Sequence, residues 1–274
     1  MKIMEYRKSI KKIHKEYSTN GSRPVEVLCD DFENYICKYG SPPAEALGRE
    51  YLASQFLKLW GIKTPQAAFV RIDPEHVPNT LSDRAQPRHF RVPTFGVRKH
   101  NYAKEVDASF EGFTEHIIRQ IDRRDLLKIA LFDLWVGNED RHQGNFNLMV
   151  DSGTDGENPY FMPIDHSLIF NSGNTEFEIT LLTFDETLIN TNLFKHFCRM
   201  SGKVQKEVDE IAESLESWKN VCRDHLDDIL NTMPQSWGID TFALNTYLQN
   251  NIFNPIWLKQ VQQHFRIYIQ ESLS

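Results

Sequence analysis

Asp140, Asn145 and Asp165 have the residue types and the order of a site that transfers a phosphoryl group. Such a reaction uses one carboxylate to orient the attacking hydroxyl and accept its proton. An amide or carboxylate oxygen then binds Mg²⁺, and a second carboxylate bridges this metal to the phosphates of ATP. Magnesium prefers hard oxygen ligands and few protein carboxylates. We therefore expect Asp140 to act on the acceptor hydroxyl, and Asn145 and Asp165 to bind Mg²⁺.

Each of these residues also has an ordinary structural explanation. Asp140 could cap the preceding helix, Asn145 could satisfy backbone groups of a turn, and Asp165 could end a strand. His142 could stabilise charge at the γ-phosphate or pack so that it shapes the loop, whereas Arg141 is expected to form a structural ion pair. The chemical explanation is favoured because three separate coincidences would be needed to place the residues in this order.

The segments around this polar loop are predicted from hydrophobic patterning. Residues 122–136 are apolar around most of a helical circumference, which is typical of a buried helix. Residues 160–162 and 168–170 are expected to be short strands on either side of Asp165. From about residue 192 to the end the pattern is helical. The polar loop is thus expected to follow a buried helix directly.

The first hundred residues are predicted to be rich in strands. A small polar loop at residues 18–22 precedes two β-prone segments joined by a turn, which predicts a hairpin able to lie over a ligand. Phe69 and Phe95 end strands and could line an adenine pocket, although core packing is the favoured alternative. The predicted elements are strands 25–28, 35–39, 67–72 and 89–97 and a helix over 44–60, with Gly61 as its C-cap. The fold class is therefore α+β.

Composition limits the partners of the chain. It has 274 residues and a net charge of −7, which argues against a DNA-binding body, and its one basic run, residues 7–12, is expected to be a solvated helix face. The four cysteines form no C-x-x-C pair and suit reduced core thiols. Neither a signal peptide nor a run of about 18–20 apolar residues is present. We expect a cytoplasmic protein without direct nucleic-acid or membrane partners.

The sequence Asp140-Arg141-His142, followed by Asn145 and then Ile164-Asp165, resembles a known kinase pattern. Protein kinases share the five-residue separation of a catalytic Asp from a metal-binding Asn, but their H-R-D order is not kept. The D-R-H-x-x-N loop resembles the phosphoinositide lipid kinases and, more closely, the HipA-like serine/threonine kinases of bacteria. This resemblance implies a bilobal protein-kinase-like fold, with an N-lobe at 1–100, a helical C-lobe at 101–274, and ATP and Mg²⁺ between them.

The resemblance covers roughly residues 15–250. The segment containing Gly21 and Ser22 is similar to the phosphate loop of HipA-like domains, and Lys38 lies where a strand lysine contacts the nucleotide phosphates. Glu50 lies in the helix that offers a carboxylate to this lysine, and it is preferred over Glu45 because it lies deeper in the helix. By the same resemblance, Ser22 is a candidate for internal phosphorylation.

Two differences and one further likeness accompany this resemblance. The loop around Gly21 has one glycine where Gly-rich loops have three, and Asp165-His166-Ser167 stands where kinases have Asp-Phe-Gly. The segment Met233–Trp237 is similar to a Pro-x-x-Trp feature of stand-alone HipA-like domains.

The resemblance implies an ATP- and Mg²⁺-dependent kinase that phosphorylates serine or threonine of a protein. One alternative is a kinase for a lipid or small molecule, although an acidic chain without a polybasic face argues against membrane work. The other is a catalytically inactive, kinase-like nucleotide-binding module. Retention of Lys38, Asp140, Asn145 and Asp165 argues against this alternative, because an inactive module has no chemical need for the set.

Overall fold

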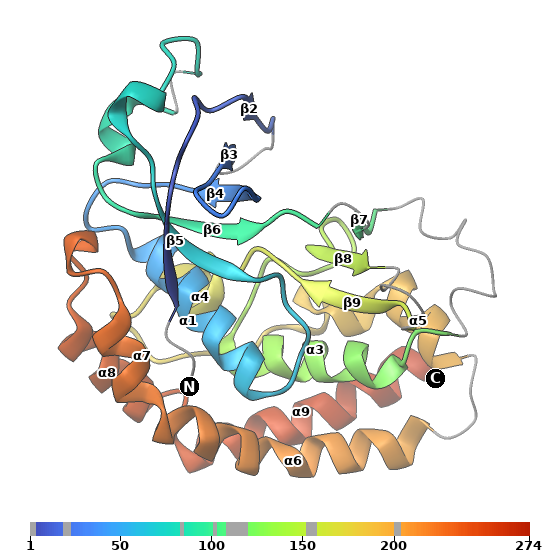
Figure 1. Ribbon diagram of the computed structural model, residues 1–274. Helices are drawn as coiled ribbons and strands as arrows, with labels where there is room; N and C mark the ends of the chain where they lie inside the picture. The colour runs from blue at the N-terminus through green and yellow to red at the C-terminus, as the bar shows by residue number, and fades with distance from the viewer. Residues whose placement is uncertain are drawn as a thin grey trace. The chain divides into compact units, whose positions relative to one another are not determined.

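The computed structural model describes residues 4–18, 23–82, 85–100, 103–107, 120–151, 158–199 and 204–274 (Figure 1). The chain forms two compact units, and neither is continuous in sequence. The first unit takes in residues 1–54, 65–101 and 227–241, and the second takes in residues 55–64, 102–226 and 242–274. Helix α1 (Glu45–Leu59) passes from the first unit into the second.

A six-stranded sheet in the order β1-β5-β6-β4-β3-β2 dominates the first unit. The predicted hairpin is confirmed, because β3 pairs antiparallel with β4 and sets Val25 opposite Cys37. Since Val25, Val27 and Cys37 belong to the core, strand alternation turns Glu26 and Lys38 to the opposite face. The strands are β1 (Glu5–Lys8), β2 (Lys15–Glu16), β3 (Val25–Leu28), β4 (Asn34–Lys38), β5 (Ala67–Arg71) and β6 (Thr94–Arg98).

Two predictions for the first unit are wrong. The basic run at residues 7–12 is not a helix face, because Arg7 lies in β1 and forms an ion pair with Asp31 at 2.8 Å. The strand predicted at 89–97 begins only at Thr94, after the 3-10 turns η1 (Pro74–His76) and η2 (Pro87–Phe90). Prolines at 87 and 93 explain the late start, since proline cannot donate to a strand ladder.

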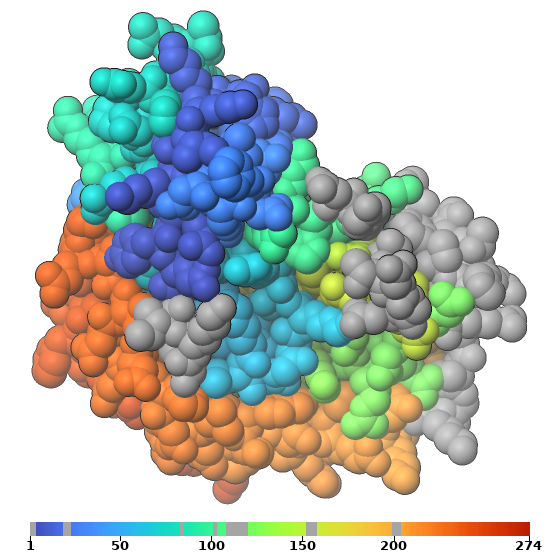
Figure 2. Space-filling model, viewed as in Figure 1, coloured from blue at the N-terminus to red at the C-terminus, as the bar shows by residue number. Residues whose placement is uncertain are grey.

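The segment 227–241 packs into the first unit, far from its neighbours in sequence. The Trp237 indole is fully buried and donates to the Pro93 carbonyl at 2.6 Å, while its ring meets Phe69 edge-on at 5.4 Å. The Tyr51 hydroxyl of α1 donates to the Ile229 carbonyl at 3.0 Å. The connection between β5 and β6, coloured teal, lies next to the blue N-terminal residues in Figure 2. Within it, the Ser82 backbone N–H donates to Glu16 of β2 at 2.9 Å. The elements of the returning segment are α7 (Leu226–Thr232) and η6 (Gln235–Trp237).

Helix α3 (Arg123–Val136) is the buried centre of the second unit, as predicted. Asp122 caps its N-terminus by accepting from the Arg124 N–H at 2.9 Å, and Gly137 ends it in the left-handed conformation at φ 60°. Trp135 donates to the Ile252 carbonyl at 2.9 Å, and its own carbonyl accepts from Trp257 at 2.9 Å. Helices α6 (Val204–Asp224) and α9 (Pro255–Leu273) pack against α3 and against each other (Figure 1).

A three-stranded sheet in the order β7-β8-β9 lies in the second unit. Strand β8 (Leu148–Asp151) follows the polar loop, and β9 (Tyr160–Pro163), which was predicted, leads to Asp165. The strand predicted at 168–170 is wrong. The turn α4 (Ile169–Gly173) stands there, and Phe170, Asn171 and Ser172 have φ of 63°, 48° and 62°.

The remaining elements of the described residues are largely helical, so the α+β class and the helical C-terminal part are confirmed. Among the described residues, no helix is both long enough and apolar enough to cross a membrane. All four cysteines are buried, and none forms a disulfide. The other elements are β7 (Ala103–Glu105), η4 (Phe184–Glu186), η5 (Leu188–Asn190), α5 (Asn192–Arg199) and α8 (Thr241–Asn250).

Candidate active site

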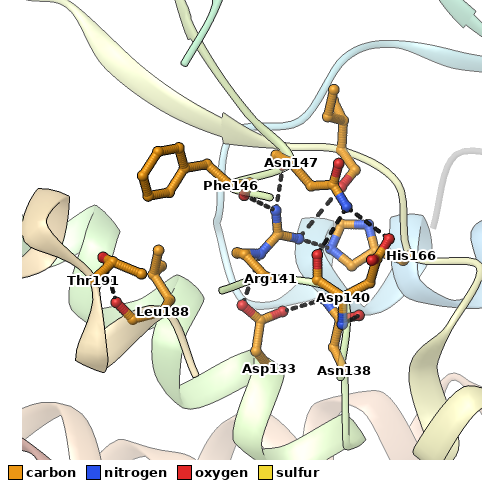
Figure 3. A network of polar contacts seen from close by, with 10 residues as sticks. Asp133, Asn138, Asp140, Arg141, Phe146, Asn147, His166, Leu188 and Thr191 are labelled. Atoms are coloured by element: carbon orange, nitrogen blue, oxygen red, sulfur yellow. Dashed lines mark hydrogen bonds and ion pairs between the residues drawn. The ribbon is translucent and has the colours of Figure 1, made fainter. Parts of the chain in front are cut away.

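The Asp140 carboxylate is held on both of its oxygens by amide side chains. Asn145 donates its Nδ2 to Oδ1 at 3.0 Å. Asn147 donates to Oδ2 at 3.0 Å and to the Asp140 carbonyl at 3.0 Å (Figure 3). The structure therefore brings the predicted pair Asp140 and Asn145 together. Asn147 was missed by the sequence analysis. Its φ of 45° suits asparagine, which tolerates the left-handed region better than most residues.

His142 shapes the turn between Asp140 and Asn145. Its backbone exchanges two hydrogen bonds with Asn145, at 3.0 and 2.9 Å, which closes the loop into a tight turn. Its ring Nδ1 accepts from the Gly144 N–H at 3.1 Å. A Cβ at Gly144 would lie 3.3 Å from the His142 ring, so a larger residue there would require the ring to shift slightly. These contacts support the loop-shaping explanation for His142, whereas its role at a γ-phosphate stays a prediction.

Asp165 has a left-handed backbone conformation just after β9. Its φ is 55°, which is uncommon for residues other than glycine, although aspartate and asparagine adopt it more often than most. The Ser167 hydroxyl donates to its Oδ1 at 2.9 Å. The preceding residue, Ile164, donates its N–H to the Asn147 carbonyl at 2.9 Å. Asp165 is thus attached through the backbone to the loop that carries Asp140 and Asn145.

Arg141 is the fully buried residue that joins these segments (Figure 3). The predicted ion pair is confirmed, because its Nε donates to Asp133 Oδ2 of α3 at 2.8 Å. Burial raises the pKa of the Asp133 carboxyl, against the opposing effect of the Arg141 and Asn138 donors. The other acceptors of the guanidinium are the carbonyls of Phe146 (3.0 Å), Asn147 and Ile164 (3.4 Å) and the Nε2 of His166 (2.9 Å).

A second ion pair lies in the first unit. Lys38 stands opposite Phe95 in the sheet and binds the Glu50 carboxylate of α1. Of the Lys38 side chain 16% is exposed, and of the Glu50 side chain 5%. Glu45 lies instead near Arg49 at 3.9 Å and is 63% exposed. The preference for Glu50 over Glu45 as the partner of Lys38 is therefore confirmed, and the contact of Lys38 with phosphates stays a prediction.

The sequence matches the HipA-like kinase family over residues 10–265. The chain belongs to the HipA-like kinase family. No curated protein matches the sequence. Among solved structures, the proinflammatory kinase CtkA of Helicobacter pylori is similar at 12% identity and a TM-score of 0.55, over 96% of this chain and 98% of that chain. The Golgi casein kinase with Mn/ADP bound is 11% identical with a TM-score of 0.48, over 96% of this chain and 74% of that chain. Family membership supports a kinase function, and the likeness to CtkA shows the fold.

In this HipA-like kinase, some of the predicted site residues either lie outside the described residues or pack in the core. Gly21 and Ser22 lie outside the described residues. Phe69 is fully buried against Tyr51 and Trp237 at ring distances of 5.2 and 5.4 Å, so its contacts are those of a core residue. Phe95 is also buried, with 3% exposed. The contacts of Phe69 therefore agree with core packing, which was the favoured alternative to an adenine pocket.

A buried carboxylate on the Lys38 face was missed by the sequence analysis. Glu26 accepts from the Tyr17 hydroxyl at 2.6 Å and from the Lys99 ammonium at 2.9 Å, and only 3% of its side chain is exposed. Burial raises the pKa of Glu26, but the hydrogen bonds from Tyr17 and Lys99 outweigh this effect and leave the pKa lowered. Glu26 thus joins Tyr17, which follows β2, to Lys99, which follows β6.

The donor set of the second unit fits a magnesium ion that arrives with a nucleotide. Asn145 turns its amide nitrogen to Asp140, so its carbonyl oxygen remains the hard donor of that side chain. Asp165 adds a carboxylate. In the part of the chain that the structure describes, no group of three or more His, Cys, Asp or Glu could hold a metal ion. Magnesium is commonly bound by one or two protein ligands and substrate phosphates, so Asn145 and Asp165 fit that mode.

Proposed function

We propose that this HipA-like kinase transfers the γ-phosphoryl group of ATP, in the presence of Mg²⁺, to serine or threonine of a protein. The observation that carries the proposal is the Asp140 carboxylate, fixed by the amides of Asn145 and Asn147 at 3.0 Å each. Enzymes of this kind act mainly by positioning and by neutralising charge. A carboxylate held on both oxygens has a defined direction in which to orient a hydroxyl.

The roles follow from the chemistry of each side chain. Asp140 orients the acceptor hydroxyl and takes its proton, and Asn145 and Asp165 hold Mg²⁺. The metal, when bound with ATP, neutralises the phosphate charge that develops during transfer. Lys38, held by Glu50, contributes an ammonium to the α- and β-phosphates of a nucleotide.

The first test measures nucleotide binding and turnover together. Thermal unfolding with and without Mg-ATP reports binding, and ATP consumption reports turnover. Asp140→Ala is expected to lower transfer by about 10²–10⁴-fold while Mg-ATP still stabilises the protein, because a general base contributes in that range. Asp165→Ala is expected to lose the stabilisation that depends on metal. Asp224→Ala, which removes an exposed carboxylate at the end of α6, is the control and keeps both properties.

The outcomes separate the competing functions. Stabilisation by Mg-ATP without turnover would favour the inactive nucleotide-binding module. Absence of any effect of nucleotide would rule out every kinase proposal, and full activity of Asp140→Ala would remove the role of Asp140. Radiolabelled ATP offered with cell lysate, tRNA, lipids and sugars then identifies the acceptor class. Label on serine or threonine of protein supports the proposal, and label on lipid or sugar replaces it with the small-molecule alternative.

A further inference from the structure

His166 stands next to Asp165 and is buried within the second unit, with 3% of the residue exposed. Its Nε2 lies 2.9 Å from a terminal nitrogen of Arg141, and its ring meets Phe132 of α3 edge-on at 6.0 Å. A guanidinium group can only donate hydrogen bonds. The His166 Nε2 therefore accepts this bond, which requires that this nitrogen carry no proton.

This hydrogen bond joins the neighbours of the two candidate carboxylates. Arg141 directly follows Asp140 in the sequence, and His166 directly follows Asp165. On the other side of Asp165, the Ile164 carbonyl accepts from the same guanidinium at 3.4 Å. The left-handed backbone of Asp165, at φ 55°, is thus held between two residues that both contact Arg141.

We infer that His166 is a positioning residue, which fixes the Asp165 segment to the Asp140 loop by accepting a hydrogen bond from Arg141. This inference rests on the proposed function of Asp140 and Asp165. In Asp-Phe-Gly kinases the corresponding residue is a phenylalanine, which has no acceptor. Here the lone pair of the His166 Nε2 links the Asp165 segment to the Asp140 loop. The geometry of the site therefore depends on this acceptor as well as on the packing of the ring.

The simpler explanation is that His166 only fills space against Phe132. Two substitutions separate the explanations, because each keeps one property of the histidine. His166→Phe keeps an aromatic ring, brings the motif closer to Asp-Phe-Gly, and loses the acceptor. His166→Gln keeps an acceptor on a flexible side chain and loses the ring. If His166 only fills space, the phenylalanine variant should be more active than the glutamine variant. If His166 positions the site, the glutamine variant should be the more active of the two.

The experiment measures kcat and the KM for ATP from Mg-ATP consumption, next to thermal unfolding. His166→Phe is expected to lower kcat by about 10–100-fold with little change in KM, since a displacement of about 1 Å can cost that much in rate. His166→Gln is expected to recover most of the loss. A His166→Phe variant as active as the wild type, or more active than His166→Gln, overturns the inference.

A measurement on the unmodified protein keeps the inference testable if His166→Phe does not fold. The nitrogen chemical shifts of the His166 ring, assigned from the signal that is lost in His166→Gln, show which ring nitrogen carries the proton. A bare Nε2 is expected, and a protonated Nε2 overturns the inference. Absence of transfer by the wild type would overturn the proposed function together with the positioning role. An active wild type with an active His166→Phe overturns the positioning role alone.

Discussion

Each of the two units contains a buried ion pair, and the two cations differ in how the protein uses them. Arg141 has no exposed surface in its side chain, and each nitrogen of its guanidinium donates to the protein. Lys38 keeps 16% of its side chain exposed beside Glu50. A planar guanidinium with five fixed donors suits the joining of several acceptors, whereas a compact ammonium on a flexible stem suits a ligand. The comparison identifies Arg141 as a structural cation, and it agrees with the phosphate-binding role that we propose for Lys38.

Removing Arg141 should have the largest effect on stability. Arg141→Ala leaves Asp133 buried without its cation and removes one donor from each of four other acceptors, and loss of one partner of a buried pair costs about 3–5 kcal/mol. Urea unfolding followed by tryptophan fluorescence measures this change. The matched control is Arg124→Ala, whose ion pair with Glu210 is 38% and 43% exposed and should contribute far less, because water screens exposed charges. Equal losses in the two variants would show that Arg141 is not the structural cation.

Removing the charges of the Lys38 pair should affect transfer more than stability. A single Lys38→Met change would leave Glu50 buried without a partner, so the sharper variant is Lys38→Met combined with Glu50→Gln. Replacing both partners of a buried pair is often nearly neutral for stability. Loss of a donor to developing phosphate charge should lower transfer by about 10²–10³-fold. Thermal unfolding without nucleotide and ATP consumption test both parts, and full transfer by the double variant would contradict a ligand-binding role for Lys38.

The two ion pairs also show how far sequence patterns reach. The pairing of Lys38 with Glu50 was predicted from the resemblance to HipA-like kinases, and Glu50 was preferred over Glu45 because it lies deeper in the helix. The Arg141 ion pair was predicted without its partner. His166 was not recognised as a contact of this loop, because its hydrogen bond with Arg141 depends on how β8 and β9 bring two segments together. Asn147 was missed although its hydrogen bonds to Asp140 lie within the loop itself.

Two further features depended on contacts between distant parts of the sequence. Nothing in the pattern of residues 227–241 indicates that Trp237 donates to the carbonyl of Pro93. The Leu-Ile-Phe run at 168–170 looks β-prone, but Phe170 is fully buried and packs against Tyr247 at 5.4 Å. Asn171 exchanges hydrogen bonds with the Thr180 backbone at 2.8 and 3.2 Å, so tertiary contacts stabilise a left-handed turn over local propensity.

A further ion pair, between Glu26 and Lys99, should have the smallest effect on stability. It extends the comparison, because its contribution should depend on pH. Burial raises the pKa of Glu26, but the Tyr17 and Lys99 hydrogen bonds leave it lowered. A carboxyl whose folded pKa is lowered contributes stability that is present above its unfolded pKa, near 4.5, and that is lost as pH falls through its folded pKa. The free energy of unfolding of the wild type should therefore fall in this acid range.

Glu26→Gln removes this titration and keeps an acceptor for Tyr17. At pH 7 the loss should be about 1 kcal/mol or less, because the Lys99 side chain is 38% exposed and water screens the pair. Below pH 4.5 the variant and wild-type stabilities should converge, since the wild type alone loses the contribution of the ionised carboxyl. Urea unfolding from pH 7 to about 3 measures both curves. Curves that stay parallel through this range would show that the charge of Glu26 adds no stability. The ion pair of Glu26 with Lys99 would then be present in the fold without contributing to its free energy of unfolding.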